Sequence, residues 1–204
     1  MLIQENSDPI ALTAQADILR FYSKVIYPAL AEFAPGPDVT GGVARDLDTF
    51  FARAQAHTHN ALCWEMRRTF GLTIGAMFER QLRSWLVSHA PERRAEIEKA
   101  VSLAGLEPLI GEIRGVVLED AGVGGDIREL RLVANAVRHG EGRSLRDLAI
   151  AAPKLWAHLP TNAIEAGHAE AIGDMRLKDS DLQRYTLAVT MFWAAAGASS
   201  VPGL

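Results

Sequence analysis

The sequence predicts an all-α protein, a single-domain helix bundle of about six or seven helices. Apolar residues recur at three- and four-residue steps along most of the 204 residues, which is the period of a helix face. Clusters of glycine and proline divide these stretches from one another. The composition, 49% hydrophobic and 23% charged, is typical of a globular domain and excludes a wholly disordered chain. We expect one domain over residues 1–204, with a tail at 198–204.

The charge and the cysteine content narrow the class of protein. A net charge of −4 means that nucleic acid would have to bind at a local patch. The single cysteine, Cys63, excludes an internal disulfide and fits a reducing compartment. The N-terminal residues lack a basic segment followed by an apolar run, and no stretch approaches about 18 apolar residues. We therefore expect a cytoplasmic protein with no membrane partner.

The first helix is predicted over residues 10–33, with a kink at Pro28 because proline lacks an amide donor. A second helical region covers residues 46–89 and would be about 65 Å long if unbroken, against an expected radius of gyration of about 17 Å. It must therefore break, near residues 57–60 or at Gly71, or project from the domain. Gly71 and Gly75 would permit a close helix approach, but we favour the simpler interpretation of two tolerated helix glycines.

Five further helices and an irregular connection complete the predicted chain. One helix starts at Pro91 and ends by Gly105, and the next covers residues 106–121. A glycine loop then leads to a helix over residues 126–139, in which Asp126 and Glu129 form a capping box and Gly140 is the stop. A short helix over 144–150 precedes an irregular connection at 157–178, with room for one strand pair. Ser180 and Gln183 form the capping box of a last helix that ends by Gly197.

The helix at 126–139 is the one segment that suggests chemistry. Arg131, Asn135, Arg138 and His139 fall on one arc of about 100° beside its apolar face. Arginine offers a planar charged fork for phosphate oxygens, and histidine transfers protons near neutral pH. Together they suit metal-independent RNA cleavage at a ribose 2′-hydroxyl. The same residues also fit a helix end, because Arg and His there favour the helix dipole. Five arginines lie in this region: Arg128, Arg131, Arg138, Arg143 and Arg146.

Residues 130–145, with the pattern Leu-Arg-x-x-x-Asn-x-x-x-His-Gly-x-Gly-x-Ser-Leu, resemble the motif helix of HEPN-like proteins. Residues 77–86 and 181–193 are similar to uncharacterised bacterial proteins of that kind. The resemblance implies a helix bundle, frequent dimerisation and an origin among toxin–antitoxin, abortive-infection and CRISPR-associated systems. His139 and Asn135 match the family's catalytic pattern, but the position of its arginine is Ala134, and Arg131 and Arg138 are the nearest replacements.

The resemblance thus implies a HEPN-like interaction or regulatory protein with weak or absent nuclease activity. Its expected partners are a second copy of the chain and either RNA or a cognate antitoxin. Two alternatives stay open. One is an active endoribonuclease that uses His139 and a nearby arginine, and the other is a structural protein with a coincidental motif.

A metal site is a weaker candidate. His57, His59, Cys63 and Glu65 lie close in sequence, yet only His59 and Cys63 share a helix face, so we expect no metal and no cofactor. Four tryptophans are predicted to be core anchors rather than a base-stacking platform: Trp64, Trp85, Trp156 and Trp193.

Overall fold

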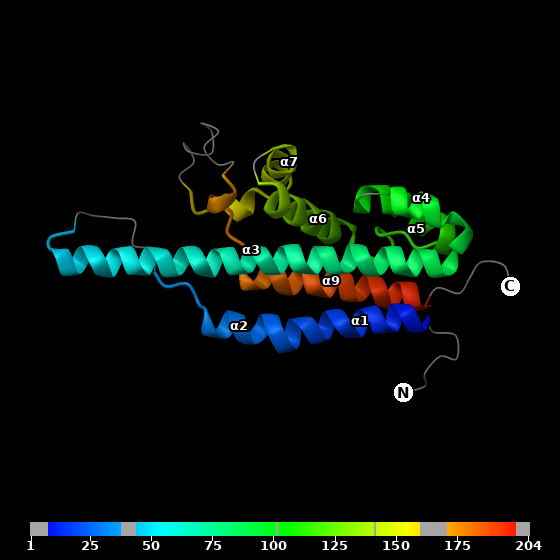
Figure 1. Cartoon of the computed structure of the whole chain (residues 1–204), viewed down its shortest axis with the longest axis horizontal. Coiled ribbons are helices and arrows are strands. Elements are labelled where there is room, and N and C mark those ends of the chain that lie inside the picture. Colours follow the sequence, from blue (N-terminus) through cyan, green and yellow to red (C-terminus); the bar gives the residue numbers. More distant parts are fainter. Residues whose placement is uncertain (1–7, 38–43, 101, 141, 160–170, 199–204) are drawn as a thin grey trace.

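A computed structural model describes residues 8–37, 44–100, 102–140, 142–159 and 171–198. These residues form a single all-α bundle without a strand (Figure 1), which confirms the predicted all-α class. They contain seven α-helices when α1, η1 and α2 are counted as one continuous helix. No helix in the described ranges is long and apolar enough to cross a membrane. The elements are α1 (Pro9–Phe21), η1 (Tyr22–Ile26), α2 (Tyr27–Glu32), α3 (Leu47–His89), η2 (Pro91–Arg93), α4 (Arg94–Lys99), α5 (Leu103–Arg114), α6 (Gly124–His139), α7 (Arg143–Ala151), η3 (Pro153–Trp156), η5 (Ile172–Asp174) and α9 (Asp179–Ala198).

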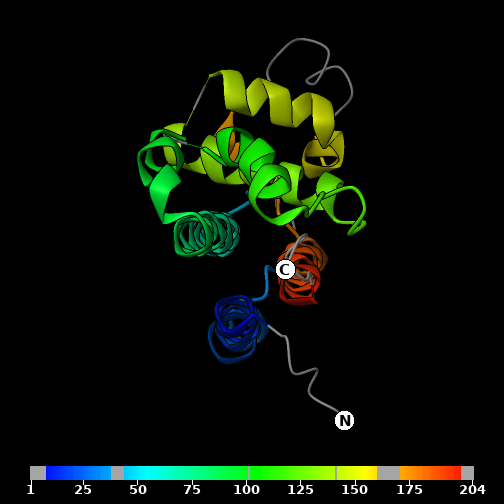
Figure 2. The same ribbon diagram turned by 90° about the vertical axis from the view of Figure 1, so that its right-hand side faces the viewer.

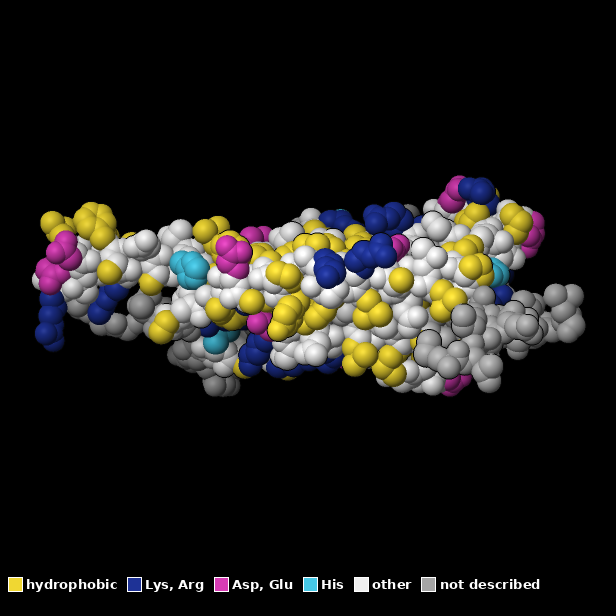
Figure 3. Space-filling view, turned by 90° about the horizontal axis from the view of Figure 1, so that it is seen from below, with side chains coloured by type: hydrophobic (Ala, Val, Ile, Leu, Met, Phe, Trp, Pro, Cys, Tyr) yellow, Lys and Arg dark blue, Asp and Glu magenta, His cyan; other side chains and the backbone are white. Residues whose placement is uncertain are grey.

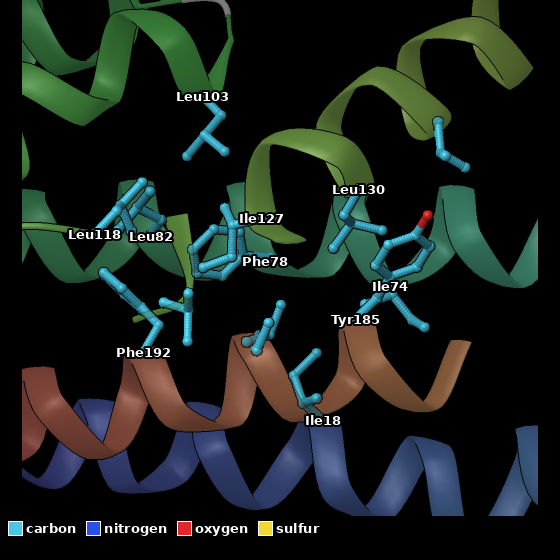
Figure 4. Close-up of a cluster of buried hydrophobic side chains, with 14 of the residues drawn as sticks. Ile18, Ile74, Phe78, Leu82, Leu103, Leu118, Ile127, Leu130, Tyr185 and Phe192 are labelled. Atoms are coloured by element: carbon cyan, nitrogen blue, oxygen red, sulfur yellow. The ribbon is translucent and has the colours of Figure 1, made fainter. Parts of the chain in front are cut away.

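The helices are arranged around α3 and α9. Seen end-on in Figure 2, α3 and α9 lie between α1–α2 on one side and the group α4–α7 on the other. Helix α1 packs chiefly on α9, and α6 packs chiefly on α3 and α7. The side chains that fill the centre come from every one of these layers (Figure 4), among them Ile18, Phe78, Leu130 and Phe192.

The first helix is interrupted just before Pro28. Asp8 caps α1, since its Oδ1 accepts a hydrogen bond from the amide of Ile10 at 2.9 Å. The interruption predicted at Pro28 takes the form of the wider π-helical segment η1, after which α2 begins with Tyr27 and the proline. A proline ring lacks an amide donor and crowds the preceding turn, and a widened turn relieves both conditions.

Helix α3 is unbroken over 43 residues. Of the two predicted outcomes, a break or a projection, the structure has the projection: the first turns of α3 extend beyond the other helices at the left of Figure 1. Burial begins at Asn60, so the first turns make little contact with the core. The helix starts at Asp46, whose Oδ1 accepts a hydrogen bond from the amide of Thr49 at 2.7 Å.

Gly71 and Gly75 are sites of close helix contact, so the simpler interpretation favoured above is wrong. A Cβ placed on Gly75 would lie 2.8 Å from the Cβ of Ala134 on α6, and one on Gly71 would lie 3.1 Å from Val133 and from Leu177. Both distances are shorter than ordinary carbon–carbon contact. The absence of two side chains therefore lets α6 approach the backbone of α3.

The predicted boundaries between residues 91 and 121 are also wrong. Helix α4 ends at Lys99 and α5 runs over Leu103–Arg114. Gly105 lies inside α5, and Ala100 sits over it: a Cβ built on the glycine would lie 3.3 Å from the Ala100 Cβ. Gly115 ends α5 with a left-handed φ of 65°, so residues 116–121 are not helical.

The two helices with predicted capping boxes begin earlier than those boxes require. Helix α6 begins at Gly124 and α9 begins at Asp179, so Asp126 and Ser180 lie inside the first turns. Asp126 and Glu129 instead pair with Arg184 on α9. The connection at 157–178 shows no strand in its described residues, and the rest of the expected strand pair falls at 160–170, outside them. The expected tail was 198–204: its first residue, Ala198, is the last residue of α9, and residues 199–204 lie outside the described residues.

Three tryptophans are core anchors, as predicted. Trp85, Trp156 and Trp193 are buried, and the rings of Trp85 and Trp193 meet edge-on with centroids 5.6 Å apart. Trp64 is only half-buried and lies against the guanidinium groups of Arg67 and Arg176, at 5.5 and 5.3 Å.

Candidate functional site

The four candidate residues lie along one edge of α6. The adjoining, buried face of the helix holds it against α3 through Ile127, Leu130, Val133 and Ala134. That packing turns the predicted polar arc outward. Arg131 and Asn135 are half-buried and Arg138 and His139 are exposed.

Their spacing makes them neighbours along that edge. Arg131 and Asn135 are four residues apart, as are Asn135 and His139, and Arg138 follows Asn135 by three. Side chains at these separations lie about 5–6 Å apart at Cβ on a helix surface. The helix therefore presents arginine, asparagine and a terminal arginine–histidine pair in one row.

Other charged side chains at the start of α6 form ion pairs with residues elsewhere in the chain. Arg128 pairs with Glu119 and Glu107. Glu129 accepts hydrogen bonds from Arg184 and from the Tyr185 hydroxyl, each at 2.6 Å. Burial opposes ionisation of Glu129, but these hydrogen bonds outweigh it and hold the pKa of the carboxyl below its ordinary value.

Four arginines remain without such partners. No hydrogen bond or ion pair to another described residue holds the side chains of these arginines in place. Asp147 on α7 is the only acidic residue among the described residues of 131–147, so the local charge is positive. Three of the four are exposed. The set, called the α6–α7 corner below, is Arg131, Arg138, Arg143 and Arg146.

Two glycines join the two halves of the corner. Gly140 ends α6 with a φ of 68° and Gly142 precedes α7 with a φ of 145°, backbone conformations that side-chain-bearing residues rarely adopt. Helix α7 then folds back on α6. Arg143, at the start of α7, therefore follows His139, at the end of α6, by only four residues.

The position that the family pattern reserves for arginine is closed. Ala134 is 4% exposed and faces Gly75. The cavity beside it, which Arg131 and Glu79 also line, measures only about 10 Å³. That is the space of one water molecule at most, and no part of a substrate would fit there. An arginine at position 134 would have to displace α3.

The weaker metal candidates do not form a ligand set. His59 Nε2 lies 3.4 Å from Cys63 Sγ and 3.1 Å from the carbonyl oxygen of Ala34, while Glu65 pairs with Arg68. Within the described part of the chain, no three His, Cys, Asp or Glu side chains group in a way that would hold a metal ion.

A serine, histidine and aspartate that the sequence did not single out lie in a row near the start of α1. Ser88 Oγ is 3.1 Å from His89 Nδ1, and His89 Nε2 is 3.0 Å from Asp8 Oδ2. However, His89 Nδ1 also lies 2.9 Å from the carbonyl oxygen of Trp85, which can only accept. Ser88 Oγ donates its hydrogen bond to the same carbonyl oxygen of Trp85 at 2.7 Å, so the hydroxyl proton is not directed at His89. The row is a structural contact and not an activated nucleophile.

The sequence also gave no sign of a basic groove beside α3, which is lined by Arg80, Arg83 and Arg94. Arg80 and Arg83 lie on one helix, but Arg94 joins them only because the chain reverses after Ala90.

Comparison with protein-family models, with curated proteins and with solved structures finds no match to this chain.

Proposed function

We propose that this chain is a HEPN-like, RNA-associated interaction or regulatory protein of a bacterial defence or toxin–antitoxin system. In this proposal the α6–α7 corner binds RNA phosphates. The supporting observation is that Arg131, Arg138, Arg143 and Arg146 have no acidic partner among the described residues, while the neighbouring Arg128 and Glu129 are fully paired. Arginines that the fold does not use for its own ion pairs are available to an external anion.

The chemistry of the corner suits a phosphate backbone. Each guanidinium offers a planar fork of donors that matches two phosphate oxygens. Asn135 lies between Arg131 and Arg138 and can donate to, or accept from, a ribose or base edge. Binding of this kind depends on charge, so it should weaken steeply as the salt concentration rises.

The same geometry argues against efficient cleavage. Cleavage at a 2′-hydroxyl needs a proton acceptor and a positioned charge on the phosphate in the transition state. His139 supplies the first, but Ala134 is buried where the family's arginine would stand. Arg131 and Arg138 lie on the outer edge of α6 and not at position 134. The proposal therefore includes weak or absent nuclease activity.

The experiment measures binding of a single-stranded RNA over a series of salt concentrations. Arg138→Ala with Arg143→Ala should weaken binding and reduce the steepness of the log–log salt dependence by about 0.7 for each lost phosphate contact. A matched control is Arg20→Ala with Lys24→Ala, which removes two exposed charges of the same sign from the opposite helix layer. Equal losses in both double variants would mean that the attraction is not localised at the α6–α7 corner.

The second arm of the experiment tests the enzyme alternative. His139 is exposed and lies one helical turn from Asn135, an arrangement that also fits a catalytic pair. Wild-type protein is incubated with RNA in excess chelator and the products are tested for a cyclic phosphate end. Cleavage that His139→Ala abolishes would replace the proposal with the endoribonuclease. If the protein neither cleaves RNA nor binds it in a salt-sensitive way, the remaining interpretation is a structural protein with a coincidental motif.

A further inference from the structure

One side of α3 is open to solvent along its whole length. In the end-on view of Figure 2, α3 lies at the margin of the bundle, with α1 on one side of it and α4 on the other. Arg80 follows Phe51 by 29 residues, which at 100° per residue returns it to within about 20° of the same direction. Exposed residues recur in this direction from one end of the helix to the other. The set, called the open face of α3 below, is Leu47, Phe51, Thr58, Leu62, Glu65, Thr69, Arg80 and Ser84.

The two ends of the open face differ in shape. At the projecting end, Leu47, Phe50 and Phe51 are each more than half exposed. At the other end, Arg80 and Ser84 line two neighbouring grooves, one of about 690 Å³ on the α4 side and one of about 420 Å³ on the α1 side. These two grooves are together called the recess below. One end of α3 thus protrudes, and the other lies between two walls.

The recess suits apolar side chains of the size of phenylalanine. Its α1 wall carries Pro9, Ile10 and Ala14, and Val87 lines the α4 side. A closed cavity of about 150 Å³ is large enough for a benzene ring. The recess therefore has space for the two phenylalanine rings that the projecting end carries.

The charges at the two ends of the open face are complementary. Arg80 lines the recess and has no hydrogen bond or ion pair with another described residue. Arg83 is less available, because its Nη2 lies 4.0 Å from Glu79 Oε2. At the projecting end, the exposed Asp48 lies in the first turn of α3, within about 60° of the centre of the open face. The first basic residue of the helix, Arg53, lies on the opposite side of it.

A single chain cannot bring these two ends together. Asp48 and Arg80 are 32 residues apart in an unbroken helix, a separation of about 48 Å at 1.5 Å per residue. Two copies can do so, because antiparallel pairing of α3 with α3 places the projecting end of each over the recess of the other. A two-fold axis near the middle of the open face, between Leu62 and Thr69, generates both contacts and closes the assembly at two copies.

We propose that two copies of this chain pair antiparallel through the open face of α3. Each copy seats Phe50 and Phe51 in the recess of the other and places Asp48 beside Arg80. A phosphate ion would contact Arg80 but leave the apolar wall and both phenylalanine rings in water. A partner that covers the recess must be both apolar and acidic, and the projecting end of a second copy is both.

The area that this pairing covers is sufficient for a specific interface. A fully covered aromatic side chain buries about 150–250 Å², so Phe50 and Phe51, each rather more than half exposed, contribute about 200 Å² per copy. Leu47, Leu62 and the surfaces that receive these side chains bring the total to about 1,200 Å², the lower limit for a stable specific interface. An interface of this size is expected to dissociate on dilution.

Light scattering of the full chain over a dilution series, combined with charge exchange, tests the pairing. Asp48→Lys and Arg80→Glu each set like charges against one another at two symmetry-related places, so each should raise the dissociation constant by about tenfold or more. The double variant restores opposite charges and should return the dissociation constant to within about threefold of the wild-type value. Because the two residues are far apart within one chain, such a coupling arises only between copies.

Asp48→Lys with Arg20→Glu is the matched control. It has the same net charge as the exchange variant, but Arg20 lies outside the lining of both grooves, so this pair should not restore the dimer. Thermal melts verify that each variant is folded. A wild-type monomer, single reversals without effect, a double variant no tighter than the single ones, or masses that grow beyond two copies would each overturn the proposal. None of these outcomes depends on RNA binding at the α6–α7 corner.

Discussion

Ala134 on α6 meets α3 where position 75 carries no side chain: a Cβ on Gly75 would stand 2.8 Å from the Cβ of Ala134. This contact joins the motif helix to the longest helix of the bundle. It also occupies the position at which a HEPN-like nuclease carries its arginine. One pair of small residues thus sets both the packing of α6 and the chemistry that is open to it.

The first prediction concerns Gly75→Ala. Alanine favours the helix by about 0.8–1 kcal/mol over glycine, but overpacking a tight contact costs about 1–3 kcal/mol. The opposing atom is the Cβ of Ala134, which cannot rotate away, so we expect a net loss of about 1 kcal/mol or more. Urea unfolding followed by circular dichroism measures it. Gly125→Ala is the control, because a Cβ there meets nothing within 4 Å, and it should not destabilise the protein.

The second prediction concerns Ala134→Arg, which introduces the arginine of the HEPN-like pattern that residues 130–145 resemble. We expect the variant to lose about 2 kcal/mol or more of stability, because a long charged side chain enters a contact with space for about one water molecule. It should not acquire chelator-resistant cleavage. Denaturant unfolding and an RNA digestion assay test the two parts separately. A stable variant that cleaves RNA would mean that α3 and α6 separate more readily than their packing indicates.

The third prediction is a loss of stability in acid that depends on Asp8. Burial alone would raise the pKa of Asp8, but hydrogen bonds from Trp85 and from the amides of Ile10 and Ala11, together with nearby His89, hold it below its ordinary value of 3.8. Its contribution to stability is therefore present above the unfolded value and is lost as the pH falls through the lower folded value. Thermal melts over a pH series should show this decline.

Asp8→Asn is the informative variant for that decline. Asparagine caps a helix about as well as aspartate, so the variant removes the charge and keeps the cap of α1. We expect a lower melting temperature at neutral pH and a flatter profile in acid. Asp46→Asn makes the same change at the exposed cap of α3, whose carboxyl also has a lowered pKa, and should flatten the profile less. An unchanged profile in Asp8→Asn would contradict the assignment.

The fourth prediction concerns self-association. The resemblance to HEPN-like proteins implies dimerisation, and the apolar stripe of α3 between Leu62 and Trp85 could extend such an interface. This stripe is mostly core, since Phe78 and Leu82 are 1% and 0% exposed. Leu62, the first residue of the stripe, is 64% exposed, and further exposed apolar side chains of α3 lie before it. Hydrophobic atoms gather at the projecting end of the helix (Figure 3), where Phe50 and Phe51 are 55% and 63% exposed. We expect a dimer that forms through this end.

Light scattering over a dilution series measures the dimer. Phe50→Ser with Phe51→Ser should raise the dissociation constant by about tenfold or more, because burial of a phenylalanine contributes about 1.5–3 kcal/mol. Leu187→Ser with Met191→Ser removes a comparable exposed apolar pair from α9 and should leave the dimer unchanged. A wild-type monomer at high micromolar concentration would contradict the dimer itself.

The sequence predicted the long elements of the fold because each has its own apolar stripe. It identified the helix at 126–139 for this reason, and the stop at Gly140 because glycine favours helix ends. The shorter helix predicted at 144–150 is also present. It does not predict the boundary between α4 and α5, because a glycine such as Gly105 is locally typical of a helix end. In the structure this glycine accommodates Ala100, a contact that no local pattern contains. Likewise, Asp126 and Glu129 fit a capping box locally, but Arg184 lies more than fifty residues away in the chain and takes both carboxylates.

The candidate site, too, was only partly predictable from the sequence. Helical spacing alone predicted that Arg131, Asn135, Arg138 and His139 would share an arc, and α6 presents them along one edge. Spacing did not reveal that Arg128 is neutralised by Glu107 and Glu119, because those partners come from α5 and the loop after it. The groove that Arg94 completes was equally invisible, since it depends on how the chain turns after Ala90.

The unbroken course of α3 has a consequence for how the molecule opens. A helix whose second half is packed on several others and whose first turns lie in solvent does not unfold as one unit. Backbone amides of residues 51–58 should exchange with deuterium by local fraying, whereas those of residues 71–86 should exchange only when the whole bundle unfolds. A binding partner that seats on the projecting end would then be detected as slowed exchange there, before any change in the melting temperature.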